Sequence, residues 1–165
     1  MSAPQSREFA VPTADAMRAW GACLGAACRG GDVIVLTGDL GAGKTTLAQG
    51  IARGMGITDA VTSPTFVIAR THPHPAAGPD LVHVDAYRLG GPTEVDDLDL
   101  ESDLARSVVV VEWGEGLVEG LSDSRLDLVI RRSAIDDDEV RTVEATAHSP
   151  RWADALADLA VVPTP

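Results

Sequence analysis

The segment GDLGAGKTT at positions 38–46 constrains this chain more than any other, because it matches the phosphate-binding pattern GxxxxGK[ST]. A short apolar stretch rich in β-branched residues, 32–37, precedes it, and apolar residues at helical spacing follow it from Leu47 to Met55. A strand, a glycine-rich loop and a helix in this order are the context in which such a loop binds phosphate. The sequence therefore predicts a nucleotide site at this point.

The residue types of the loop suit phosphate and Mg²⁺. Glycines let backbone N–H groups approach phosphate oxygens, and the N-terminus of the following helix adds partial positive charge. Lys44 is expected to reach the β- and γ-phosphates, and the Thr45 hydroxyl is expected to coordinate Mg²⁺. The predicted nucleotide-binding residues of the loop are Asp39, Leu40, Gly41, Ala42, Gly43, Lys44, Thr45 and Thr46.

Length and composition indicate one globular domain. Of the 165 residues, 45% are hydrophobic and 23% charged, which is typical of a chain that buries a core. We expect a single P-loop ATPase domain over 1–165, with a loose N-terminus at 1–9 and a C-terminal helix and tail at 149–165. The apolar stretches are too short to span a membrane, and no signal-like segment opens the chain, so a cytoplasmic location is expected.

The order of apolar segments predicts a three-layer α/β domain of the P-loop NTPase type with a mostly parallel central sheet. Residues 33–37 and 108–112 are expected to form central strands, because their apolar runs suit parallel strands covered on both faces. Strands at 125–132 and 139–146, joined by a turn, predict an antiparallel C-terminal extension. The other expected elements are a helix over 12–28, a helix from the loop to Gly54 or Gly56, a strand over 81–87, a short helix within 93–104 and a final helix capped by Ser149.

Two acidic residues at the ends of expected strands are the predicted partners of the loop. Mg²⁺ prefers oxygen ligands, and open α/β sheets bind ligands at the carboxyl ends of their strands. Glu112 ends the valine strand, and alternation places Asp85 on one strand face with His83 and Tyr87. We expect Glu112 and Asp85 to join Thr45 at the metal; the alternatives are a solvated acid for Glu112 and a surface ion pair for Asp85.

A third candidate is the segment Ser63-Pro64-Thr65, which follows the helix after the phosphate loop. Many nucleotide-dependent switches carry their first switch loop at this place in the chain. Thr65 is therefore a candidate sensor of the γ-phosphate through Mg²⁺. The same three residues also suit an ordinary turn.

Four motifs in order resemble the TsaE (formerly YjeE) family, the small bacterial ATPases of tRNA threonylcarbamoyladenosine biosynthesis. They are GDLGAGKTT at 38–46, SPTF at 63–66, HVDAYRL at 83–89 and VEW at 111–113, and the resemblance covers about 10–147. It implies that Lys44 binds phosphate, that Thr45 and Glu112 bind Mg²⁺, and that Asp85 is needed for ATP hydrolysis. It also implies functional roles for Thr65 and Trp113, a nucleotide contact by Thr13, and a basic nucleotide contact for which Arg131, Arg132 and Arg141 compete.

The resemblance further implies an accessory role rather than direct modification of tRNA. The family binds a complex of the threonylcarbamoyl-transferase protein and its inactive paralogue, and ATP hydrolysis resets that complex between turnovers. The net charge of −12 disfavours broad contact with a nucleic-acid backbone, so tRNA is expected to be held by the partners. The acidic run at 94–103 fits either a partner surface or a solvated helix face.

Two other classes of nucleotide-binding protein share the strand, loop and helix. A small-molecule or nucleoside kinase usually carries an arginine-rich lid, and the arginines that follow the loop here are scattered. A guanine-specific switch usually carries an Asn-Lys-x-Asp motif, which this sequence lacks. The kinase therefore remains as the alternative to the ATPase.

Overall fold

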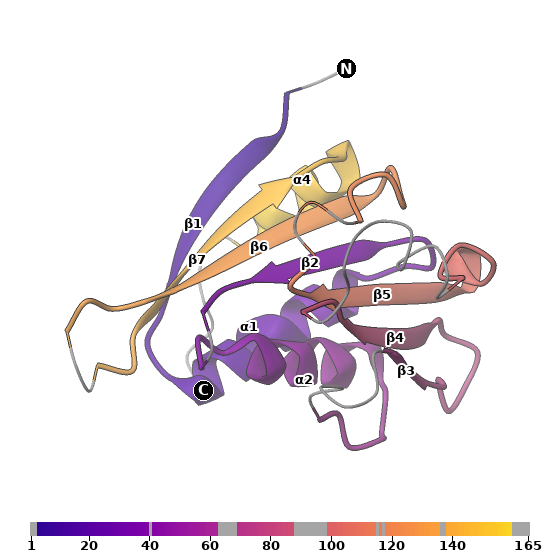
Figure 1. Ribbon diagram of the computed structural model, residues 1–165, viewed down its shortest axis with the longest axis horizontal. Helices are drawn as coiled ribbons and strands as arrows, with labels where there is room; N and C mark the ends of the chain where they lie inside the picture. The colour runs from indigo at the N-terminus through magenta and orange to yellow at the C-terminus, as the bar shows by residue number, and fades with distance from the viewer. Residues whose placement is uncertain are drawn as a thin grey trace.

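The computed structural model describes residues 3–39, 41–62, 69–87, 99–114, 116, 118–135 and 138–159. Within these ranges, seven strands form one sheet in the order β1-β7-β6-β2-β5-β4-β3 (Figure 1). The elements are β1 (Gln5–Val11), α1 (Ala14–Ala27), β2 (Val33–Thr37), α2 (Lys44–Met55), β3 (Ala69–His72), β4 (Asp80–Asp85), η1 (Leu104–Arg106), β5 (Ser107–Glu112), β6 (Arg125–Arg132), β7 (Arg141–Ala147) and α4 (Pro150–Asp158). The predicted α/β fold class is confirmed.

The centre of the sheet is parallel, and this brings three strand ends to one edge. β2 lies between β5 and β6 and is parallel to both, and β4 is parallel to β5. β5 is buried over its whole length, as its valine run predicts. Because parallel strands point the same way, the carboxyl ends of β2, β4 and β5 meet at the edge where the phosphate loop begins.

The antiparallel pairs lie at the two sides of the sheet. β7 pairs with β6, β1 with β7, and β3 with β4. The predicted C-terminal extension is present, but β6 is itself parallel to β2, so the antiparallel part begins at β7. Residues 5–9 belong to β1 and not to a loose segment. Only Phe9 and Val11 of β1 are buried, so the apolar pattern is too short to show that the strand begins as early as Gln5.

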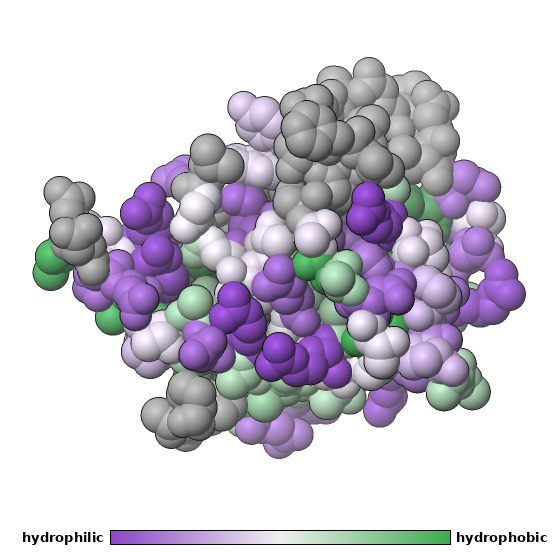
Figure 2. Space-filling model, turned by 90° about the horizontal axis from the view of Figure 1, so that it is seen from below, coloured by the Kyte–Doolittle hydropathy of each residue, from purple (hydrophilic) through white to green (hydrophobic). Residues whose placement is uncertain are grey.

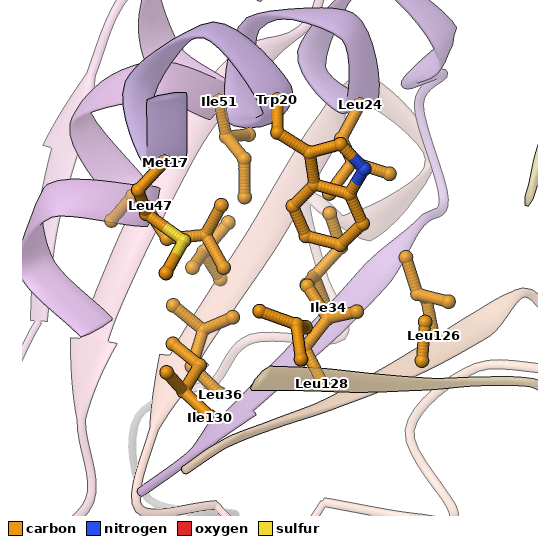
Figure 3. Packing of buried hydrophobic residues seen from close by; sticks show 14 of the residues in the cluster. Met17, Trp20, Leu24, Ile34, Leu36, Leu47, Ile51, Leu126, Leu128 and Ile130 are labelled. Carbon is orange, nitrogen blue, oxygen red and sulfur yellow. The ribbon is translucent and has the colours of Figure 1, made fainter. Parts of the chain in front are cut away.

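One face of the sheet is covered by α1 and α2, which lie side by side in Figure 1. Figure 3 shows side chains of both helices pointing towards β2 and β6, and all of these side chains are buried. The labelled ones are Met17, Trp20, Leu24, Leu47 and Ile51 from the helices and Ile34, Leu36, Leu126, Leu128 and Ile130 from the strands. Burial of each large apolar side chain contributes about 1.5–3 kcal/mol, which holds both helices on the strands.

The backbones of α1 and α2 approach each other very closely. A Cβ atom added at Gly25 would lie 2.1 Å from the Ile51 carbonyl oxygen, and one added at Gly54 would lie 2.0 Å from that of Ala22. Only glycine fits at such a crossing. α2 starts at the phosphate loop. The close approach of the two helices therefore fixes the distance between the N-terminus of α1 and that loop.

The other face of the sheet carries a smaller core. Val33 and Val35 of β2 and Val109 and Val111 of β5 are buried there with Leu100 and other residues of the connections on either side of β5. Of the described residues in this layer, 99–103 form turns and η1 is a single helical turn. The short helix expected within 93–104 falls mainly outside the described residues.

The face of the molecule in Figure 2 is mostly hydrophilic where it is coloured, with hydrophobic residues in small separate spots. In the part of the chain that the structure describes, none of the helices combines the length and the hydropathy needed to cross a membrane.

Candidate functional site

The phosphate loop connects the end of β2 to the first turn of α2. Gly41 and Gly43 have φ angles of 78° and 116°, a backbone region that favours glycine. Gly43 is the N-cap of α2, and among the described residues no side chain caps this end. The first-turn N–H groups therefore remain available to an anion, as at a phosphate-binding helix N-terminus. Leu40 lies outside the described residues.

Lys44 lies inside the curve of the loop. Its Nζ donates hydrogen bonds to the carbonyl oxygens of Gly38 (2.7 Å) and Asp39 (3.0 Å), and it lies 4.2 Å from the centroid of the Trp113 ring. Burial lowers the pKa of Lys44, while the carboxylates of Glu112, Asp85 and Asp39 oppose that shift. A cation in a partly desolvated loop, held by two carbonyl groups, is ready to exchange them for phosphate oxygens.

Glu112 joins the strand end to the first turn of α2. Its side chain is buried, and its Oε1 accepts a hydrogen bond from Thr45 Oγ1 at 3.3 Å. Its Oε2 lies 2.6 Å from Nε2 of His83, a β4 residue with no exposed surface. A buried carboxylate is costly unless it is paired, and here both oxygens have partners.

Asp85 lies beside Glu112 at the end of β4, because the two residues are register partners between β4 and β5. Its Oδ1 accepts a hydrogen bond from the backbone N–H of Tyr87 at 3.0 Å. The Tyr87 ring lies 5.2 Å from the Trp113 ring and is 67% exposed. Trp113 has a φ angle of 62°, a strained value for a non-glycine residue, and it stands between Lys44 and the exposed tyrosine.

A small cavity of about 170 Å³ opens on the other side of the loop. Its lining includes Thr13 and Met17, the loop residues 41–43, and Arg141. Thr13 Oγ1 caps α1 by accepting the N–H of Ala16 at 3.0 Å, so this hydroxyl also has a structural role. Thr46, the last predicted loop residue, lines the same cavity.

Arg141 is the one of the three competing arginines that hydrogen-bonds to the loop in the described structure. Its Nε donates to the Ala42 carbonyl oxygen at 3.2 Å. Arg131 instead pairs with Glu144 at 2.9 Å, and Arg132 is exposed at the end of β6. Of the three arginines, Arg141 is therefore the one that also lines the cavity beside the loop.

The structure brings together the predicted residues Lys44, Thr45, Asp85, Glu112 and Trp113. Thr65 lies outside the described residues, so its predicted role remains untested. The sequence pattern placed His83 on the same strand face as Asp85, but it did not predict the contact of His83 with Glu112. The available signal was that His83 lies two positions before Asp85, on the strand face that carries this acid.

Comparisons with known proteins all point to the same family. The family model described as "Threonylcarbamoyl adenosine biosynthesis protein TsaE" matches residues 11–142. A Streptomyces coelicolor protein named tRNA threonylcarbamoyladenosine biosynthesis protein TsaE is 57% identical over 88% of this chain and 99% of its own length. A protein of the same name from Mycobacterium tuberculosis is 50% identical over 74% of this chain and 77% of its own. Among solved structures, the crystal structure of Bacillus subtilis YdiB aligns with a TM-score of 0.76 at 31% identity, covering 97% of each chain.

Proposed function

Because the chain belongs to the TsaE family of tRNA threonylcarbamoyladenosine biosynthesis proteins, we propose that it is a Mg²⁺-dependent ATP hydrolase of that pathway. The observation that carries this proposal is the Thr45–Glu112 pair across the phosphate loop, with the Lys44 ammonium beside it. A hydroxyl and a carboxylate at the start of the helix are the hard oxygen ligands that Mg²⁺ takes in nucleotide sites.

The residues present fit ATP or ADP with Mg²⁺. The uncapped helix start and the loop backbone offer N–H donors to phosphate oxygens, and Lys44 would leave its two carbonyl partners to contact the β- and γ-phosphates. Thr45 and Glu112 would hold the metal, which when bound neutralises charge on the phosphate oxygens. The cavity bounded by Thr13 and Arg141 would receive the nucleoside end.

Asp85 and Trp113 would act at the γ-phosphate side. Asp85 stands next to the metal-binding carboxylate and would orient the attacking water or a water of the metal shell. Trp113, which contacts Lys44 in the described structure, would adjust as the lysine turns to phosphate. A role for Thr65 as a γ-phosphate sensor rests on the sequence resemblance.

We further propose that the partners are the threonylcarbamoyl-transferase protein and its inactive paralogue, with tRNA reached only through them. Hydrolysis would reset that complex between turnovers. The net charge of −12 supports this division, since an acidic chain suits a basic protein partner better than a phosphate backbone.

Nucleotide binding by Lys44→Ala tests the site. Lys44 is the only lysine of the sequence, so the substitution removes the loop's ammonium and no other lysine can replace it. Loss of a charge-assisted contact of about 1.5–3 kcal/mol predicts a rise in the Kd for ATP of at least about tenfold. Calorimetry with ATP and Mg²⁺ measures this Kd.

Arg53→Ala is the matched control, because it removes one positive charge from the last turn of the same helix at an exposed position. It should leave the Kd for ATP unchanged. Equal affinity of the wild type and Lys44→Ala would show that the loop does not bind the nucleotide through Lys44.

A further inference from the structure

His83 is a buried polar residue whose contacts point into the proposed metal site. It lies in β4, opposite Val110 of β5, and has no exposed surface. Its Nε2 lies 2.6 Å from Glu112 Oε2, while its Nδ1 is buried without a hydrogen-bond partner in the described part of the chain. Because Nδ1 has no partner there, the ring nitrogen in position to donate a hydrogen bond is Nε2, which faces the Glu112 carboxylate.

The two carboxylate oxygens of Glu112 face different residues. Oε2 faces the ring of His83, and Oε1 faces the Thr45 hydroxyl at the start of α2. A glutamate side chain has three rotatable bonds, and one hydrogen bond from a rigid ring on the neighbouring strand restricts them. The oxygen left towards Thr45 is then the one that can bind a cation beside the loop.

An apolar residue would satisfy the packing of β4 at this position. Leu81, two residues earlier on the same strand face, is fully buried in the apolar core, and histidine at position 83 leaves one ring nitrogen unpaired. Among the described residues, the contact with Glu112 is the one hydrogen bond of the His83 ring, so this contact distinguishes histidine from an apolar residue here.

We propose that His83 is a positioning residue: its Nε2–H holds the Glu112 carboxylate in the orientation in which Oε1 and Thr45 bind the divalent cation of the nucleotide. The inference rests on the proposed function, since it assigns a role towards that cation. Residues that orient a metal ligand in this way commonly contribute about 10–100-fold to metal affinity.

The pair His83→Gln and His83→Asn tests the proposal. The amide nitrogen of glutamine reaches about as far from the backbone as Nε2 and can donate to Glu112, whereas that of asparagine reaches only as far as Nδ1. Both substitutions introduce an amide at the same buried position. They therefore differ in their reach to Glu112 rather than in polarity.

The measurement is the affinity of Mn²⁺ for the complex of each variant with ADP, followed by electron paramagnetic resonance. The Kd for ADP without metal and the circular dichroism spectrum report whether the fold and the loop are intact. His72→Gln is the matched control, because His72 is also buried and lies on the neighbouring strand β3, but its Nδ1 lies 3.6 Å from Asp59 Oδ2.

We expect His83→Asn to weaken Mn²⁺ binding by at least about tenfold, with His83→Gln and His72→Gln close to the wild type. The Kd for ADP without metal should stay the same in all of them. Equal Mn²⁺ affinities in the two His83 variants would overturn the proposal, as would equal losses of metal-free ADP binding, which indicate a structural role. A wild-type protein that binds neither ADP nor Mn²⁺ would instead refute the proposed function, and the inference with it.

Discussion

Asp85 is the residue whose proposed role in turnover can best be separated from nucleotide binding. It is a neighbour of Glu112 in register, and its recorded hydrogen bond goes to the backbone of Tyr87 rather than to the loop. We expect Asp85→Ala to lower kcat for ATP hydrolysis at least about tenfold while the Kd for the nucleotide changes no more than a few-fold. Hydrolysis should be measured with the proposed partner proteins present. Normal kcat in this variant would remove Asp85 from the mechanism.

His72 gives the chain a stability that depends on pH. Burial lowers the pKa of His72 below its ordinary 6.5; Asp59 partly opposes this, whereas His83 and Arg70 add to it. As the pH falls through 6.5, the unfolded chain therefore binds a proton at this residue before the folded chain does, and stability is lost. In His72→Gln this contribution is absent. The free energy of unfolding should therefore fall more between pH 7 and pH 5 for the wild type than for the variant, with pH values chosen to bracket the ordinary pKa. Parallel curves from chemical denaturation would contradict this.

Among the elements, the crossing of α1 and α2 connects packing to the site. Gly54→Ala would place a methyl group against the Ala22 carbonyl oxygen, and overpacking of this kind costs about 1–3 kcal/mol. If the helices separate to relieve it, the cavity between Thr13 and the loop widens as well. We therefore expect lower stability in denaturant melts together with weaker ADP binding by calorimetry.

Gly120→Ala is the control for this change, because a Cβ atom at Gly120 meets no atom within 4 Å. It should be neutral in both measurements. A Gly54→Ala variant as stable as Gly120→Ala would mean that the helices can shift without cost.

For the whole molecule, the prediction concerns how the nucleotide controls docking. Tyr87 is exposed and its ring packs at a tilt against Trp113, which in turn contacts Lys44, so a change at the phosphates can reach the surface through three residues. We expect the Kd for the proposed partner pair to differ between ADP, a non-hydrolysable ATP analogue and no nucleotide. Tyr87→Ala should reduce this difference more than Ile135→Ala does; Ile135 is another exposed apolar residue, in the connection from β6 to β7. Three equal dissociation constants in the wild type would favour the kinase alternative.

We expect the isolated chain to hydrolyse ATP slowly and to be accelerated by the proposed partners. Arg141 donates a hydrogen bond to the carbonyl oxygen of Ala42 in the loop. This contact lies on the cavity side of the loop rather than beside Glu112 and Asp85. An arginine placed at the transferred phosphate is worth about 10³-fold or more in rate, so a partner that supplies one would raise kcat strongly. Steady-state hydrolysis with and without the partner pair measures this. A fast isolated chain with no further acceleration would contradict the prediction.

The sequence alone determined the features that depend on short-range pattern. The phosphate loop, the strand before it, the helix after it and the buried valine strand are all encoded in runs of adjacent residues, whose periodicity follows from local geometry. The position of Glu112 at a strand end followed from the same pattern. These features were enough to predict the fold class and most of the residues that gather at the loop.

Only the tertiary structure decided which distant residues meet. The contact of His83 with Glu112 depends on the register of β4 against β5, and the hydrogen bond of Arg141 to the phosphate loop depends on where β7 starts beside that loop. The pairing of β1 with β7 likewise joins segments that lie more than 100 residues apart in the sequence. Such pairings are selected by the packing of whole elements across the sheet, and a single sequence read along its length contains no local signal for them.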